Sequence, residues 1–192
     1  MDETEQPDAP RSPHLNVIRR YLPDVVYGAN DGLVTTFAIV SGVAGAGLSR
    51  TVVLILGFAS LVADGFSMAS SDYLSERTPK QDEERTSRAS AARHGYATFA
   101  GFIAPGVVPL LPYVLPVAAE YRFPAAAGLT LLTLFVVGAG RGALSSLSPW
   151  RAGLEMLTVG ALAAGAAYAV GVLGSALAGG DFAAVSVALT GP

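Results

Sequence analysis

Long apolar stretches separated by short polar segments dominate this chain of 192 residues. A helix needs about 20 apolar residues to cross a hydrocarbon core about 30 Å thick. Stretches of roughly this length occur at residues 24–47, 51–75, 95–117, 125–144 and 154–178. The pattern therefore predicts an all-α integral membrane protein with five transmembrane helices.

The polar segments set the predicted domain organisation. Residues 1–22 lack the basic-then-apolar order of a secretory signal, and we expect them to form a disordered cytosolic tail. Residues 23–178 form the predicted transmembrane domain, in which residues 76–94 make the one sizeable loop, a short cytosolic linker. Residues 179–192 are the predicted tail on the non-cytosolic side.

The positions of lysine and arginine predict the orientation, because loops facing the cytosol carry the excess of positive charge. With a cytosolic N-terminus, ten of the 12 basic residues fall on the cytosolic side, and only Arg50 and Arg122 fall on the other. The N-terminus is therefore predicted to lie in the cytosol.

Composition supports the membrane interpretation and excludes several chemistries. Charged residues make up 14% of the chain, whereas an average soluble domain has about 25%. Cysteine is absent, which removes disulfides and thiolate sites, and a net charge of -3 provides no basic surface for nucleic acid. The spans hold no Gly-x-Ser-x-Gly motif, and the two histidines, His14 and His94, lie outside them, so we expect no enzyme.

Four prolines fall within the third stretch, namely Pro105, Pro109, Pro112 and Pro116. Each removes a backbone donor and disturbs the helix, so this span is predicted to be bent or broken. The freed carbonyls either bond to neighbouring helices or help to line a pathway. The sequence leaves both interpretations open.

Ionisable side chains at membrane depth are costly and mark candidate functional sites. Asp31 lies between Gly28 and Gly32 near the start of the first span. These glycines weaken the helix and let an ion or another backbone come near. A helix N-cap is the structural alternative for such a carboxylate, although Asp24 after Pro23 fits that role better. Asp31 is therefore our first candidate metal ligand.

The second span carries a polar face. Asp64, Met68 and Asp72 follow at a spacing of four and stack on one side of a helix, and Glu76 continues the row. Carboxylate oxygen with thioether sulfur favours Fe(II) or Mn(II) over alkali ions. A methionine can also be core filler, and Asp72 and Glu76 can also cap the helix or pair with Arg77. We take all four as candidate metal ligands.

Glu155 lies one turn into the last span, at the predicted cytosolic side. The positive end of the helix dipole stabilises a carboxylate there without any metal. Glu155 is the sixth candidate metal ligand, with this structural alternative beside it.

Four blocks of the sequence together resemble the vacuolar iron transporter family, including its nodulin-like and bacterial members. They are residues 26–38 (VYGANDGLVTTFA), 63–69 (ADGFSMA) with Tyr73, Leu74 and Ser75, 108–113 (VPLLPY), and 153–156 (GLEM) with Gly160, Ala163 and Ala164. The resemblance implies a five-helix protomer that forms a homodimer, with an ion path at the dimer interface lined by the first two spans. It also implies export of Fe(II) or Mn(II) from the cytosol in exchange for protons. We expect no bound cofactor. The family's pathway Asp and Met fall on Asp31 and Met68.

The chain departs from the plant-type pattern of this family in two places. Ser60 stands where those members have a second-span Glu, and Asp64 lies one turn further on the same face. Those members also carry a long acidic helical domain that gathers metal, whereas the linker at residues 76–94 is short. We expect Asp64 to supply the carboxylate and expect no such domain.

Other functions are compatible with these residues. Intramembrane carboxylates also suit a structural or partner-binding membrane protein, and the ligand types also suit a transporter of another divalent cation. The expected location is a bacterial inner membrane, while a vacuole-like membrane would have the same topology. The expected partners are the metal ions, the lipid bilayer and a second copy of the chain.

Overall fold

The computed structural model describes residues 13–78, 87–145 and 147–190, with side chains described between residues 20 and 179 of these ranges. Over these residues the chain is helical and contains no strand. The elements are α1 (Pro13–Gly45), α2 (Arg50–Arg77), α3 (Arg88–Gly106), the 3-10 turn η1 (Val108–Leu110), α4 (Leu111–Val114), α5 (Ala119–Leu144) and α6 (Pro149–Thr190). The all-α prediction is confirmed.

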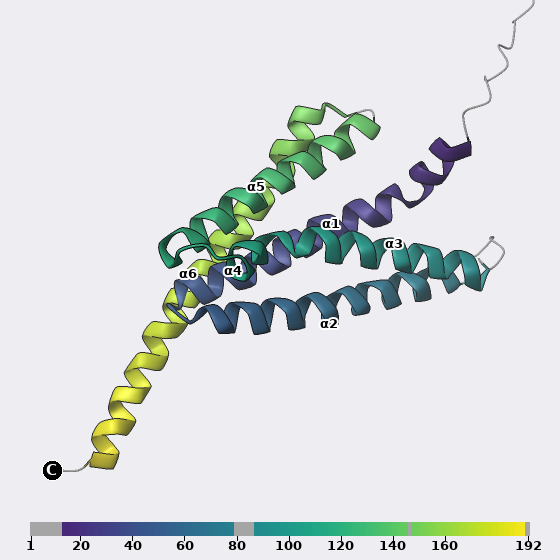
Figure 1. Cartoon of the computed structure of the whole chain (residues 1–192). Helices are drawn as coiled ribbons and strands as arrows, with labels where there is room; N and C mark the ends of the chain where they lie inside the picture. The colour runs from purple at the N-terminus through teal and green to yellow at the C-terminus, as the bar shows by residue number, and fades with distance from the viewer. Residues whose placement is uncertain (1–12, 79–86, 146, 191–192) are drawn as a thin grey trace, which may run out of the picture.

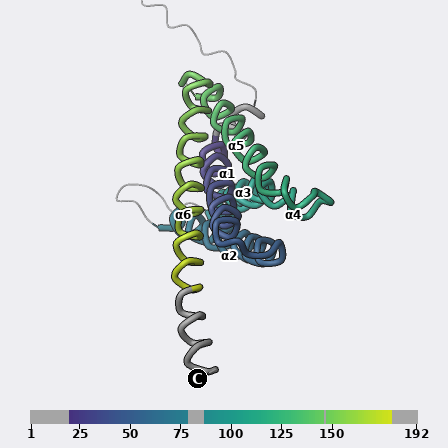
Figure 2. Tube along the Cα trace, turned by 90° about the vertical axis from the view of Figure 1, so that its left-hand side faces the viewer, coloured from purple at the N-terminus to yellow at the C-terminus, as the bar shows by residue number. Residues whose placement is uncertain are grey.

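Helix α1 lies at the centre of the bundle (Figure 1). It packs most extensively against α3 and α6 and also contacts α2 and α5. Helix α2 pairs with α3 on one side of α1, and α5 pairs with α6 on the other (Figures 1 and 2). The central helix therefore has two different flanks.

Glycines bring these helices close together. A Cβ atom added at Gly28 of α1 would lie 2.5 Å from the carbonyl oxygen of Thr98 in α3. A Cβ atom at Gly171 of α6 would collide with the carbonyl oxygen of Gly42 in α1. Small residues allow such close backbone approach in membranes, where the hydrophobic effect does not drive helices together.

Within the described residues, four helical segments are long and apolar enough to cross a membrane: Arg50–Arg77, Arg88–Val114, Ala119–Leu144 and Pro149–Gly179. Their outward side chains are apolar; Ile55, Val62 and Phe66 of α2, for example, are 62%, 64% and 69% exposed. Such surfaces suit contact with lipid, and the chain is an integral membrane protein. The first predicted span lies in α1 and is not among the four, because Asn30 and Asp31 lower its mean hydropathy.

Three boundaries differ from the predicted ones. Helix α1 begins at Pro13, inside the segment predicted as a disordered tail, and α6 continues to Thr190, well past residue 178. The linker between α2 and α3 is shorter than predicted, since α2 runs to Arg77 and α3 begins at Arg88. Apolar length locates only the part of a helix that suits lipid, whereas backbone hydrogen bonding carries the helix further. Residues 1–12 and 79–86 of the predicted tail and linker lie outside the described residues.

The predicted break in the third span is confirmed. Helix α3 ends at Gly106, and η1 and α4 each begin with a proline in their first turn, Pro109 and Pro112. Arg50 of α2 donates from Nε to the carbonyl oxygen of Tyr113, at 2.5 Å, and from Nη2 to that of Val114, at 3.2 Å. A neighbouring helix therefore takes up these two carbonyls, which favours the packing interpretation for them.

Candidate functional site

One end of the bundle contains a polar hollow of about 570 Å³ between α1, α2 and α3. The residues that line it are mainly carboxylate, hydroxyl and thioether groups: Pro23, Asp24, Tyr27, Ser67, Met68, Ser71, Asp72, Ser75 and Thr98. Met68 and Asp72 line it together because they lie one helical turn apart on α2. The hollow therefore offers hard oxygen and soft sulfur donors side by side.

Asp72 is held by a neighbour across the hollow. The Thr98 hydroxyl of α3 donates to Asp72 Oδ2 at 2.7 Å and also lies 3.2 Å from the carbonyl oxygen of His94. The sequence suggested a helix cap or an Arg77 partner for Asp72, and the structure adds this bond to α3. The wall of the hollow thus depends on the close packing of α3.

A second connection at this end was not predicted from the sequence. His94 Nδ1 of α3 lies 2.6 Å from Asp24 Oδ2 of α1, and these side chains are only 12% and 17% exposed. The Tyr21 ring lies against the imidazole, with 4.7 Å between the ring centroids. Asp24 is thus inside α1 and is no N-cap, as the helix begins eleven residues earlier at Pro13. No local spacing could reveal this pair, since 70 residues separate the partners.

The mouth of the hollow is acidic. Asp72 and Glu76 of α2 both lie close enough to Asp24 to interact with it electrostatically. Three carboxylates from two helices therefore interact electrostatically at this end, and one of them, Asp24, contacts the His94 imidazole. The local field of these carboxylates favours a cation between them.

Asp31 and Asp64 form a second acidic pair further along α1 and α2. The two carboxylates lie close enough to interact electrostatically, and both side chains are half-buried. The Ser60 hydroxyl donates to the Asp64 carboxylate. Ser60 therefore orients the carboxylate that was predicted to substitute for the second-span Glu of the plant-type pattern.

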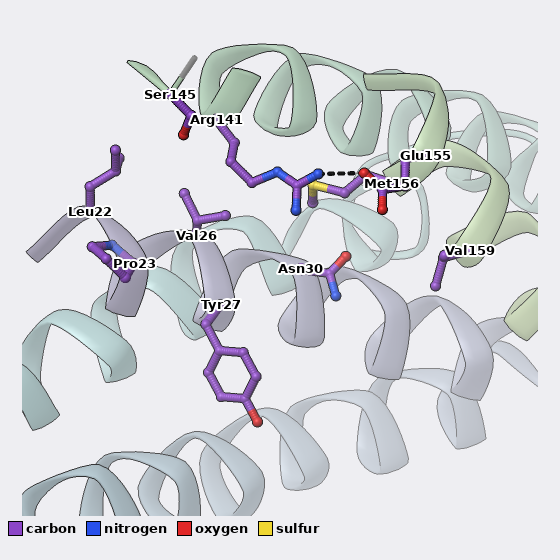
Figure 3. A pocket seen from close by; sticks show the side chains of 10 residues that line it. All are labelled: Leu22, Pro23, Val26, Tyr27, Asn30, Arg141, Ser145, Glu155, Met156 and Val159. Atoms are coloured by element: carbon purple, nitrogen blue, oxygen red, sulfur yellow. Dashed lines mark hydrogen bonds and ion pairs between the residues drawn. The ribbon is translucent and has the colours of Figure 1, made fainter. Parts of the chain in front are cut away.

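Glu155 lies apart from the other five candidates. It lines a different hollow, between α1, α5 and α6, and its carboxylate accepts a hydrogen bond from Arg141 Nη2 at 2.6 Å (Figure 3). Helix α1 separates the two hollows, and only its Pro23 and Tyr27 line both. The sequence did not reveal this arginine partner of Glu155.

No metal site is fully assembled within the part of the chain that the structure describes. There, no group of three or more His, Asp or Glu side chains lies close enough together to hold a metal ion. The candidate ligands of α1 and α2 instead lie at two places. Met68 and Asp72 line the hollow, and Asp31 lies near Asp64 further along the two helices.

Known proteins match this chain over most of its length. The model of the VIT family matches residues 22–91 and 81–172. The vacuolar iron transporter of Toxoplasma gondii is 25% identical, covering 89% of this chain and 80% of the relative. Vacuolar iron transporter homolog 1 of Oryza sativa subsp. japonica is 32% identical, covering 81% of this chain and 75% of the relative. Vacuolar iron transporter 1 of Arabidopsis thaliana is 24% identical, covering 76% and 82%.

The two matched segments take in every candidate ligand, from Asp31 to Glu155, and confirm the resemblance found in the sequence. Their overlap at residues 81–91 ends in the first turn of α3. The Toxoplasma alignment spans 241 positions, more than the 192 residues of this chain, so that relative is longer within the matched region. The chain belongs to the VIT family.

Proposed function

We propose that this chain is a metal-ion transporter that moves Fe(II) or Mn(II) out of the cytosol in exchange for protons. The observation that carries the proposal is the hollow in which Met68 and Asp72 lie side by side, in a chain whose relatives are named vacuolar iron transporters. Carboxylate oxygen suits Mn(II), and thioether sulfur adds affinity for softer transition metals.

The proposed path follows the carboxylates along α1 and α2. Metal enters at the mouth near Asp72 and Glu76, passes Met68, and reaches Asp31 and Asp64. The electrostatic interaction between these two aspartates supports the last step, because two neighbouring carboxylates gain from a shared divalent cation. When the ion leaves outward, one carboxylate takes up a proton, which relieves the repulsion and supplies the exchanged charge.

The active unit in this proposal is a homodimer. One chain offers no group of three acidic or imidazole ligands within the described residues. A two-fold axis beside α1 and α2 would double each ligand and complete a shell. The apolar, outward-facing side of α2 is consistent with contact to lipid or to a second copy.

The proposed topology has five spans and a cytosolic N-terminus. Helix α1 is the first span, because its packing against α2, α3, α5 and α6 half-buries Asn30 and Asp31 within the bundle. The hollow then opens to the cytosol, on the side that holds most of the basic residues. A bacterial inner membrane or a vacuole-like membrane would accommodate this arrangement.

Metal flux into proteoliposomes tests the proposal. Purified protein should carry Fe(II) or Mn(II), and an opposing pH gradient should change the rate; Zn(II) and Ca(II) serve as comparison ions. Asp31→Ala and Met68→Ala should abolish flux while the dimer stays assembled. Glu120→Ala is the matched control, because Glu120 is an exposed carboxylate in the first turn of α5, outside both hollows.

Undiminished flux in both variants would refute the assigned path. If folded, dimeric protein carries no ion at all, the result would favour the alternative of a structural or partner-binding membrane protein. If only Zn(II) moves, transport stands and the metal assignment is wrong.

A further inference from the structure

The hollow beside Glu155 has the size and the polar groups of a separate binding site. It measures about 450 Å³ and lies between α1, α5 and α6. Its lining combines apolar side chains, Leu22, Pro23, Val26, Met156 and Val159, with polar ones, Asn30, Tyr27, Arg141, Ser145 and Glu155. Tyr27 points away from Arg141, toward the opposite flank of α1 (Figure 3). The hollow thus presents an amphipathic interior.

Arg141 is the distinctive group of this hollow. Its Nη2 donates to Glu155, but its Nε is buried and has no hydrogen-bond partner within the described residues. The planar guanidinium carries several donors and can bind a second oxygen acceptor while it keeps the first. Asn30 lies below the guanidinium and faces it (Figure 3). A donor-rich wall therefore faces the hollow.

Neighbouring residues place the hollow at the level of lipid headgroups. Arg151 lines an adjoining hollow that shares Glu155, so two arginines accompany one glutamate. Trp150 is 66% exposed and its ring meets Phe135 edge-on, with 5.0 Å between centroids. Tryptophan collects at the membrane–water interface. Arg141 in the last turn of α5 then lies at the same depth as Trp150 at the start of α6.

We propose that this hollow binds the headgroup of an anionic phospholipid from the cytosolic leaflet. The phosphate accepts from the Arg141 guanidinium, the Asn30 amide donates to a glycerol ester carbonyl, and the apolar side chains of the lining hold the first acyl carbons. A free phosphate offers the same oxygen atoms, but it would leave the apolar side chains of the hollow without a partner. Anionic lipids gather in the cytosolic leaflet. The inference rests on the membrane orientation given under Proposed function, and it does not require transport.

Lipid binding to metal-free protein in detergent tests the proposal. Native mass spectrometry would measure retained lipid from equal amounts of phosphatidylglycerol and phosphatidylcholine. We expect retention of phosphatidylglycerol to dominate. Arg141→Gln should weaken it roughly tenfold, the factor that one charge-assisted hydrogen bond supplies. Arg93→Gln, which removes an exposed charge at the same end of the bundle, should leave it unchanged.

Glu155→Gln separates lipid binding from a structural role of the ion pair. Both Arg141→Gln and Glu155→Gln remove the pair, but only the first removes the lipid donor. Phosphatidylglycerol retention should fall in Arg141→Gln and stay or rise in Glu155→Gln. An equal fall in both would mean that the pair only holds α5 to α6 and would overturn the proposal.

Competition with inorganic phosphate distinguishes the source of the ligand. Millimolar phosphate should leave phosphatidylglycerol bound; complete displacement would assign the hollow to a soluble phosphate and overturn the lipid assignment. Because the assay contains no metal, its failure would leave the proposed transport untouched. If flux fails while lipid binding follows the expected pattern, the proposed transport is wrong and the lipid site stands.

Discussion

Gly28→Ala should loosen the contact between α1 and α3 on which the candidate site depends. The added Cβ would lie 2.5 Å from the Thr98 carbonyl oxygen and 2.8 Å from the Phe102 amide nitrogen. The first distance is 0.9 Å shorter than the 3.4 Å at which ordinary contact begins. Both neighbours are backbone atoms and cannot rotate away, so the helices themselves must separate.

The cost follows from this geometry. Extra methyl groups in a tightly packed interior cost about 1 to 3 kcal/mol of unfolding free energy. For a chain of this size, each 1 kcal/mol corresponds to about 2 to 4 °C in Tm. Separation of α3 would also pull Thr98 away from Asp72, so we expect the metal flux to fall together with the stability.

Thermal unfolding in detergent, followed by the fluorescence of Trp150 and by size exclusion, measures the first effect. Gly140→Ala in α5 is the matched control, because a Cβ there meets nothing within 4 Å. Alanine favours a helix over glycine by up to about 1 kcal/mol, so the control should be neutral or slightly stabilising. If Gly28→Ala unfolds at the same temperature as Gly140→Ala, close packing at Gly28 is not a source of stability and the reasoning fails.

Three further outcomes are expected. His94→Ala deprives Asp24 of its partner and should lower the unfolding free energy by about 1 to 3 kcal/mol, with part of the loss recovered in His94→Gln; equal Tm values for wild type and His94→Ala would contradict this. Arg50→Ala leaves two carbonyls at the end of α4 without their donor and should cost about 1 to 3 kcal/mol in the same assay, whereas an unchanged Tm would mean that other groups satisfy them. Asp64→Asn removes one charge beside Asp31 and should slow divalent flux in proteoliposomes without altering the dimer, a result that full flux would reject.

The sequence by itself determined the class of protein and most of its candidate ligands. Apolar length and charge asymmetry depend on local composition, so the helices from α2 to α6 were predictable without knowing their neighbours. The four-residue spacing of Met68 and Asp72 likewise survives in any helix, and the structure places both in one hollow. The prolines predicted the break after Gly106 for the same local reason.

The tertiary structure alone decided which of these groups meet. His94 and Asp24 are 70 residues apart, and Arg141 and Glu155 lie on different helices, so their pairing depends on how α1, α3, α5 and α6 cross. Glu155 was a candidate ligand together with the second-span residues, whereas α1 lies between its hollow and theirs. Helix crossing is fixed by the fit of small residues across an interface, and that fit is a property of two surfaces together rather than of either stretch of sequence.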